Sequence, residues 1–201
     1  MQQQNPDRGT DSDAGFTMVE VLFTIALATT VVSMAIPSTR DAVDELRTAM
    51  AARYLAARLA EARTSAVTRS SCVGLRFTDE GSDYRFTPYA DGNGNGIRSL
   101  DIALGIDIPI GSPETLGEKF PGVSIGLMNG YPDADNIAGT GADGLRIGKP
   151  RIETMSPDGT ATAGTVYLHG RRSQFAVRIL GTTGRVRVLQ YRPAGGEWIA
   201  R

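Results

Sequence analysis

The sequence contains one cysteine, Cys72, and one histidine, His169, among 201 residues. A single cysteine excludes a disulfide within the chain, although in an oxidising compartment it could pair with another chain. Cys72 is expected to be a small buried residue at the start of a strand. With no second histidine or cysteine to share a metal, and no nucleophile in a recognisable motif, His169 is expected to be a strand-end residue. No glycine-rich phosphate loop follows a strand and opens a helix. These absences predict a protein that is not an enzyme and that uses no cofactor.

Charge of either sign is nearly balanced overall but unevenly distributed. The formal net charge is −1, yet residues 79–143 contain 11 acids and 3 bases, and residues 145–201 contain 10 bases and 3 acids. The overall balance points to no particular class of partner. An asymmetry of this kind within one chain can mark an interaction surface.

One long apolar run stands out, from Phe16 to Ile36, and it ends at Pro37. As a helix it would be about 31 Å long, enough to cross the hydrocarbon core of a bilayer. A charge within such a segment is costly, so Glu20 needs a cationic partner. The run lacks the basic start and the small-residue cleavage site at its far end that mark an ordinary secretory signal. The small residue precedes it, at Gly15, so cleavage there would leave the apolar helix on the mature protein.

The register of Gly15, Phe16, Glu20 and Pro37 resembles that of type IV pilins and type II secretion pseudopilins. The resemblance implies that a prepilin peptidase cuts after Gly15 and methylates Phe16. Glu20 is then the fifth mature residue, and Pro37 is the proline that kinks or loosens the helix. The alternative is that the apolar helix is an ordinary single-pass membrane anchor in which Glu20 occurs by chance.

A physical role for Glu20 follows from its distance to the new N-terminus. The freed α-amino group of Phe16 is a cation, and a carboxylate one turn further on is its natural counter-charge. If the two groups belong to neighbouring subunits, the pair sets the axial register of an open helical filament. The alternative is that Glu20 pairs with its own N-terminus and acts only locally.

The chain divides into four predicted segments. Residues 1–15 are polar, without apolar periodicity, and are expected to be a leader; residues 16–37 form the transmembrane and assembly helix. Residues 38–70 continue it as an amphipathic helix, and residues 71–201 form a β-rich head. Five apolar residues at spacings of three and four predict the buried stripe of this continuation: Ala52, Leu55, Leu59, Ala62 and Ala66.

The head shows the two-residue alternation of strands. Residues 72–77 and 84–89 are expected to form a hairpin, and weaker strands are expected at 101–109 and 123–127. The C-terminal part predicts strands at 165–169, 174–180, 185–191 and 197–199. The fold class is therefore α+β: a long N-terminal helix, membrane-spanning in its first half, packed on an antiparallel, sandwich-like sheet, as in type IV pilins.

Three C-terminal segments and the helix end refine the resemblance. Residues 59–69, 156–160, 164–166 and 184–187 resemble the GspH/FimT-like minor pilins and pseudopilins. The resemblance implies a structural subunit that enters or primes a pilus or pseudopilus. Its implied partners are other pilins or pseudopilins, the prepilin peptidase and the inner-membrane assembly platform. Its implied location is the bacterial inner membrane, single-pass with the head in the periplasm, and then the filament. A type IV pilus and a type II secretion system both remain open.

The loop Asp91-Gly92-Asn93-Gly94-Asn95-Gly96 spaces oxygen side chains as an EF-hand loop does. Calcium would be held by Asp91, Asn93 and Asn95. The twelfth position is Ile102, where a bidentate glutamate is needed, and so a tight Asx/Gly turn without a metal is favoured.

Gly184-Arg185-Val186-Arg187 places two guanidinium groups on one strand face. The motif resembles the Gly-Arg-x-Arg of FimT-like minor pilins that bind DNA during natural transformation. Arginines on a solvated strand face are an ordinary alternative, and an acidic middle region folded beside them would neutralise them. DNA is thus a second candidate partner, and its expected contacts are Arg185, Arg187, Arg171, Arg172 and Arg178.

Overall fold

The computed structural model describes residues 15–81, 83–134, 143–148 and 150–201, without the side chains of residues 34–38. The predicted leader lies outside the described residues except for Gly15. The chain divides into two units between Arg40 and Asp41.

Helix α1 (Met18–Arg69) is 52 residues long and is helical on both sides of Pro37, which confirms the predicted continuation past that proline. Beyond Ser38 it contains no glycine or proline and is rich in alanine, leucine, glutamate and arginine, which are strong helix formers. It ends where Ser70 adopts a left-handed conformation, with φ of 52°, and Ser71 N–H donates to the carbonyl of Ala66.

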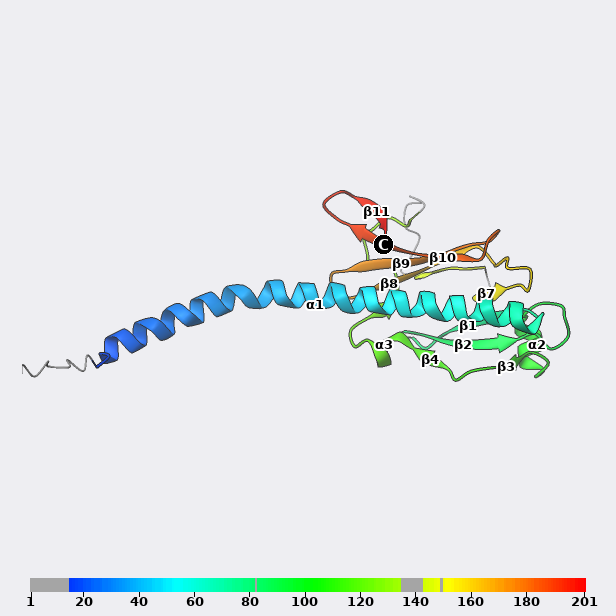
Figure 1. Cartoon of the computed structure of the whole chain (residues 1–201), viewed down its shortest axis with the longest axis horizontal. Helices are drawn as coiled ribbons and strands as arrows, with labels where there is room; N and C mark the ends of the chain where they lie inside the picture. The colour runs from blue at the N-terminus through cyan, green and yellow to red at the C-terminus, as the bar shows by residue number, and fades with distance from the viewer. Residues whose placement is uncertain (1–14, 82, 135–142, 149) are drawn as a thin grey trace, which may run out of the picture. The chain divides into compact units, whose positions relative to one another are not determined.

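Two antiparallel sheets make up the head (Figure 1). Sheet A has the order β3-β2-β1-β7, with β4 also on β2; sheet B has the order β11-β10-β9-β8-β5, with β6 also on β8. The strands of sheet A are β1 (Val73–Asp79), β2 (Tyr84–Ala90), β3 (Ile108–Pro109), β4 (Glu114–Thr115) and β7 (Ile152–Met155). Those of sheet B are β5 (Ser124–Ile125), β6 (Leu145–Arg146), β8 (Gly164–His169), β9 (Gln174–Leu180), β10 (Arg185–Arg192) and β11 (Glu197–Ala200). Two short helices, α2 (Ser99–Ala103) and α3 (Leu116–Lys119), lie in the connections.

The predicted hairpins are confirmed. β1 pairs with β2 so that Phe77 lies opposite Phe86, and β8, β9, β10 and β11 form a meander at the predicted positions. The strand expected at 123–127 is present but short, at Ser124–Ile125. The strand expected at 101–109 is wrong over most of its length: α2 lies there, and only Ile108–Pro109 is extended. The Asp107 carboxylate accepts from the N–H groups of Gly92 and Arg98, which closes this segment into a loop.

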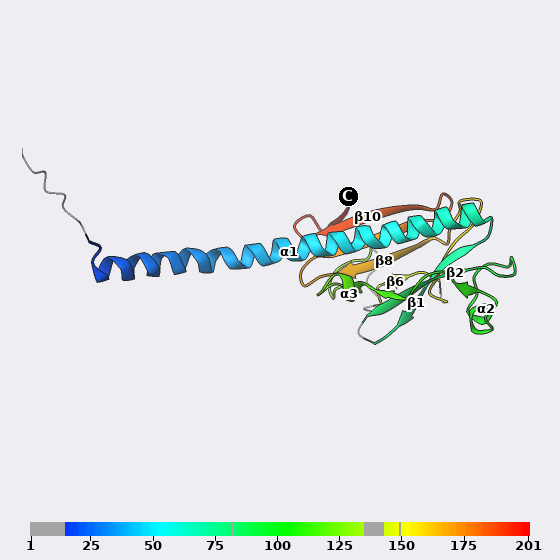
Figure 2. The same ribbon diagram turned by 60° about the horizontal axis from the view of Figure 1, so that its bottom comes forward.

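One core joins α1 to both sheets (Figure 2). The predicted stripe is confirmed: Ala52, Leu55, Leu59 and Ala66 are fully buried and Ala62 nearly so. Each buried leucine stabilises the fold by about 1.5 to 3 kcal/mol relative to an exposed one. Alternate residues of the strands point toward α1 and complete this core. They include Leu75 and Phe86 from sheet A and Val166, Phe175 and Val177 from sheet B.

A set of hydrogen bonds to the Asp44 carboxylate joins α1 to the turn between β8 and β9. The carboxylate of Asp44 accepts from the backbone N–H groups of Arg171 (2.7 Å), Arg172 (3.0 Å) and Ser173 (3.1 Å) and from the Ser173 hydroxyl (2.8 Å). Burial alone would raise the pKa of Asp44, but these hydrogen bonds lower it below its usual value. Helix and turn approach closely because Gly170 has no side chain: a Cβ there would lie 2.4 Å from Asp44 Oδ1.

Candidate functional site

Helix α1 begins with a capping residue next to the predicted processing site. Thr17 precedes the helix, its hydroxyl oxygen accepts from the N–H of Glu20 (3.3 Å), and its carbonyl accepts from Val21. Thr17 is thus the N-cap and Glu20 the third helical residue, the residue types of a capping box. The Glu20 carboxylate is exposed in the first turn, where the helix dipole favours a negative charge. Among the described residues no cation contacts it, and in the uncleaved chain Phe16 has a peptide nitrogen rather than an amino group.

The first half of α1 exposes apolar side chains on every side. Phe16 is 78% exposed, and further exposed residues are Met18, Val19, Val21, Leu22, Phe23, Ile25, Leu27, Val31 and Val32. The hydroxyls between them are satisfied within the helix: those of Thr24, Thr29, Thr30 and Ser33 each donate to a carbonyl three or four residues earlier. No water is needed to satisfy these groups, so this stretch is suited to an apolar environment.

Residues 16–37 are the predicted membrane span. Over the residues that the structure describes, no helix combines the length and the apolar character needed to cross a membrane.

The arginines of the predicted DNA site separate into two groups. Arg185 and Arg187 are exposed at alternate positions of β10 and therefore share a face. Arg178 on β9 lies opposite Arg187, so it belongs to the same face. The sheet register adds one residue that the sequence gave no signal for: Arg146 on β6 lies opposite Thr165, which lies opposite Arg178.

Arg171 and Arg172 lie at the other end of β9, in the turn before it. Their backbone N–H groups bind Asp44, and the Arg172 side chain pairs with Asp41 at 2.7 Å. The head therefore brings three of the five predicted arginines together and gives the other two a contact with α1.

The predicted calcium loop is held together by its own side chains. Asp91 accepts from the N–H groups of Asn93, Gly94 and Gly96, and Asn93 accepts from Asn95 N–H. Burial alone would raise the pKa of Asp91, but these hydrogen bonds lower it. Within the described part of the chain no group of three or more histidine, cysteine, aspartate or glutamate side chains is placed to hold a metal. The geometry is that of the Asx/Gly turn, with its oxygens already used.

The single histidine and cysteine have local contacts. His169 ends β8, as predicted, and its Nδ1 lies 2.9 Å from the carbonyl oxygen of Gly170. Cys72 is half-buried directly before β1, and burial raises the pKa of its thiol. A raised pKa disfavours the thiolate, and the side chain is half-buried where the sequence predicts a buried one.

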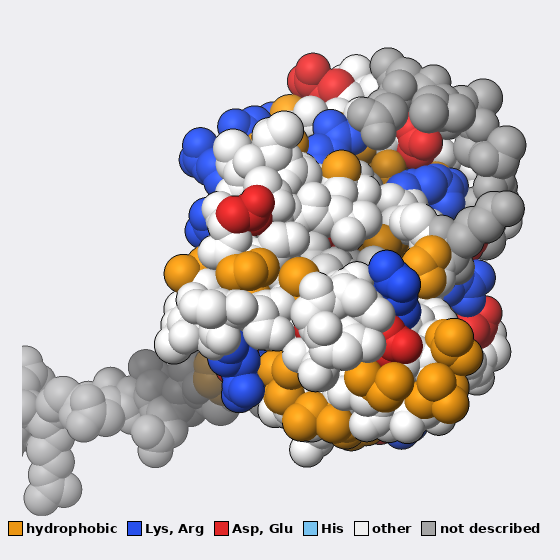
Figure 3. Space-filling view, turned by 90° about the vertical axis from the view of Figure 1, so that its right-hand side faces the viewer, with side chains coloured by type: hydrophobic (Ala, Val, Ile, Leu, Met, Phe, Trp, Pro, Cys, Tyr) orange, Lys and Arg blue, Asp and Glu red, His pale blue; other side chains and the backbone are white. Residues whose placement is uncertain are grey.

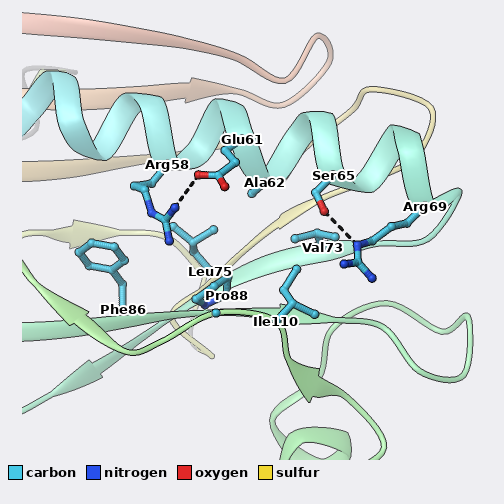
Figure 4. A pocket seen from close by; sticks show the side chains of 11 residues that line it. Arg58, Glu61, Ala62, Ser65, Arg69, Val73, Leu75, Phe86, Pro88 and Ile110 are labelled. Atoms are coloured by element: carbon cyan, nitrogen blue, oxygen red, sulfur yellow. Dashed lines mark hydrogen bonds and ion pairs between the residues drawn. The ribbon is translucent and has the colours of Figure 1, made fainter.

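A pocket of about 180 Å³ lies between α1 and sheet A (Figure 4). Its wall is apolar, from Val73, Leu75, Phe86, Pro88 and Ile110, and Arg58 and Arg69 stand at its rim. Arg58 is held by Glu61 (2.5 Å) and Glu114 (2.8 Å), and Arg69 donates to the Ser65 hydroxyl. The apolar wall offers room for an apolar side chain, and the charged groups at the rim are held in the ion pairs and the hydrogen bond just described.

A second apolar surface lies at the end of the head formed by α2 and β3. Leu100, Leu104, Ile106 and Ile108 are all exposed there, by 38% to 68%. Figure 3 views this end, where hydrophobic side chains gather over its lower part. Exposed apolar patches of this kind are typical of protein contact sites.

No protein-family model matches the chain, and no curated protein matches it. The similar solved structures include two of the minor pseudopilin EpsH from the type II secretion system of Vibrio cholerae. One is 15% identical, with a TM-score of 0.44 over 72% of this chain and 97% of the other. The second is 12% identical, with a TM-score of 0.37 over 78% and 94%. Both are minor pseudopilins, the class that the motifs of this sequence resemble.

Proposed function

We propose that the chain is a minor pilin or pseudopilin, a structural subunit that is cleaved after Gly15 and assembled through α1. The observation that carries the proposal is the first half of α1, whose apolar side chains are exposed on every side and whose hydroxyls bond within the helix. A helix of this kind is unfavourable in water and needs either lipid or other apolar helices around it. Insertion in the inner membrane, followed by packing among other pilins or pseudopilins in the filament, provides both.

The implied partners are the prepilin peptidase, the inner-membrane assembly platform and the other subunits. The head, on the periplasmic side, would make its contacts through surfaces such as the apolar patch at α2 and β3. Glu20 is proposed to meet the α-amino group of Phe16 from a neighbouring subunit. Its exposed position in the first turn leaves it available for that contact.

Processing is tested with Gly15→Ala in cells that contain the peptidase. A Cβ at residue 15 would meet nothing within 4 Å, so the substitution should not disturb the chain itself. We expect cleavage to be impaired, because the added methyl group obstructs the peptidase. Intact mass and N-terminal sequencing should show the wild type and the control Thr17→Ser, which keeps the cap hydroxyl, beginning at methylated Phe16. Retention of residues 1–15 in assembled wild-type protein would refute processing.

Assembly is tested with Glu20→Ala. The change removes the counter-charge and makes the helix more apolar, so membrane insertion should persist while incorporation into sheared filaments fails. Glu118→Ala, which removes an exposed carboxylate of the head, is the control and should assemble normally. Wild-type incorporation of the Glu20 variant would remove the register role.

DNA binding is a second proposal, favoured by the shared face of Arg178, Arg185 and Arg187. Duplex DNA should bind without sequence preference and more weakly as salt rises, because each neutralised phosphate releases counterions. Changing Arg185 and Arg187 to glutamine should lower the salt slope by up to about 2. Absence of binding by the parent at low salt, or unchanged binding by the double variant, would leave only the scaffold role.

A further inference from the structure

The outer edge of sheet B is only partly covered. β11 pairs with β10 over Leu189–Arg192, and the N–H of Arg201 donates to the carbonyl of Val188 (3.0 Å). Among the described residues no strand pairs with Arg185–Arg187 on this side. Backbone groups of alternate residues in an antiparallel strand point to alternate neighbours. Val186, two residues before Val188, therefore directs its N–H and its carbonyl toward the open edge.

A cavity of about 280 Å³ lies beside this edge, between β10 and α1, which run side by side in both ribbon views (Figures 1 and 2). On the α1 side it is lined by Ala56, Ala60, Arg63 and Thr64, and the two alanines leave room for an extended backbone to approach Val186. The lining residues used here are Ala56, Ala60 and Arg63 of α1 and Gly184, Arg185 and Val186.

The surroundings of the edge are cationic. Arg185 and Arg187 are exposed, and no carboxylate of the described residues contacts either of them. Arg63 contributes a third guanidinium, whose only described bond is to the carbonyl of Gly159 at 3.4 Å. Three guanidinium groups that no carboxylate of the described residues contacts favour an anionic partner.

We propose that the Arg185–Arg187 edge of β10 binds an extended acidic segment of another protein by strand addition. In an added strand, the residue opposite Val186 faces α1, so it must be small and apolar. The residues on either side share the face of Arg185 and Arg187 and should be acidic, because opposite charges across strands attract. The recognised pattern is acidic, small apolar, acidic. This goes beyond the filament role and does not depend on it.

A second copy of the chain is a poor occupant of the same edge. Antiparallel self-pairing about Val186 would place Arg185 of one copy opposite Arg187 of the other, twice, and like charges in such positions repel. Duplex DNA is the other anionic candidate, but it would contact the arginine side chains without using the Val186 N–H. The backbone group therefore distinguishes strand addition from nucleic-acid binding.

The test uses the full-length chain in detergent micelles and a short capped peptide of alternating glutamate and valine. A lysine-valine peptide is the charge-reversed control. We expect only the acidic peptide to bind, and it should slow hydrogen exchange of the Val186 amide by about tenfold or more at saturation. Val186→Pro removes the outward N–H at an edge position that tolerates proline, and it should abolish binding while far-UV circular dichroism stays unchanged.

A second variant keeps the test decisive if the proline variant does not fold. Arg185→Gln with Arg187→Gln should weaken binding and its salt dependence. Arg192→Gln, on the same strand but opposite Glu197 where β11 already pairs, should leave both unchanged. The proposal is overturned by equal binding of the lysine peptide, by no binding of the acidic one, or by an unprotected Val186 amide in the complex. It is also overturned if duplex DNA displaces the peptide and binds the folded proline variant as tightly as the parent.

Discussion

Glu153 is a buried carboxyl group whose burial lowers the stability of the fold. It lies on β7 opposite Leu75, is 0% exposed, and neither of its side-chain oxygens has a hydrogen-bond partner. A Cβ at Gly164 would come within 3.3 Å of its Oε2, so the carboxyl group lies against the backbone of β8. Burial raises the pKa of Glu153 from 4.5 to about 8. The group is thus protonated in the folded protein at neutral pH and ionised in the unfolded chain.

The sign and size of the effect follow from linkage. Below pH 4.5 both states hold the proton and Glu153 makes no pH-dependent contribution. Between pH 4.5 and 8 only the folded state holds it, so the free energy of unfolding falls by about 1.4 kcal/mol per pH unit. At pH 7 the accumulated loss is about 3 kcal/mol, and above pH 8 it levels off near 5 kcal/mol. Glu153→Gln has the same shape and no titration, and should lack this loss.

The assay is urea unfolding of the full-length chain in detergent from pH 4 to pH 9, followed by the fluorescence of Trp198. This single tryptophan packs on Tyr167 and Tyr191, so its emission reports the folding of sheet B. We expect the difference in stability between Glu153→Gln and wild type to grow with pH over the stated window. Glu197→Gln, the same change at an exposed site, should show no such trend. A difference that is flat with pH, or that favours the wild type more at high pH, would refute the reasoning.

Two further predictions concern the carboxylates that close loops. Asp44→Ala should lower the free energy of unfolding by roughly 2 to 4 kcal/mol, because three backbone N–H groups lose a charged acceptor. Asp41→Ala breaks one exposed ion pair and should lower it by less than about 1 kcal/mol. Urea titration measures both changes. Asp91→Ala should destabilise the head by roughly 2 kcal/mol, because the loop N–H groups lose their acceptor. Millimolar calcium should leave the melting temperature of the wild type unchanged. A melting temperature that rises with calcium in the wild type but not in Asp91→Ala would show instead that the loop opens and binds the metal.

Periodicity was enough to predict most of the fold. The spacing of Ala52, Leu55 and Leu59 identified the buried face of α1, and two-residue alternation located every long strand of sheet B. These features are local, because one element's own pattern determines which of its faces is buried. The segment around Asp101 differs from the expected strand because it is held by contacts that its own pattern does not show: the Asp107 carboxylate accepts from the N–H groups of Gly92 and Arg98, 15 and 9 residues earlier.

The missed site residues depend on contacts between distant elements. Arg146 joins the arginine face only through the pairing of β6 with β8, and β6 is two residues long. Asp44 looks like any surface acid of an amphipathic helix until the turn 170–173 is placed over it. Glu153 sits in the short run Ile152–Met155, and the sequence of this run does not reveal that its carboxyl group is buried next to Gly164 of β8.

The effect of the acidic residues 79–143 on the arginines of β10 depends on where their carboxylates lie in the fold. An excess of acids over residues 79–143 would oppose DNA or an acidic peptide if those carboxylates lay beside the arginines of β10. Instead, Asp83 accepts from the N–H groups of Tyr84, Ile125 and Gly117, and Asp91 and Asp107 accept from backbone N–H groups of their own loop. Carboxylates bound in this way stabilise their loops. Among the described residues no carboxylate contacts Arg185 or Arg187, although the chain as a whole is nearly neutral, and this local positive charge is what an anionic partner would meet.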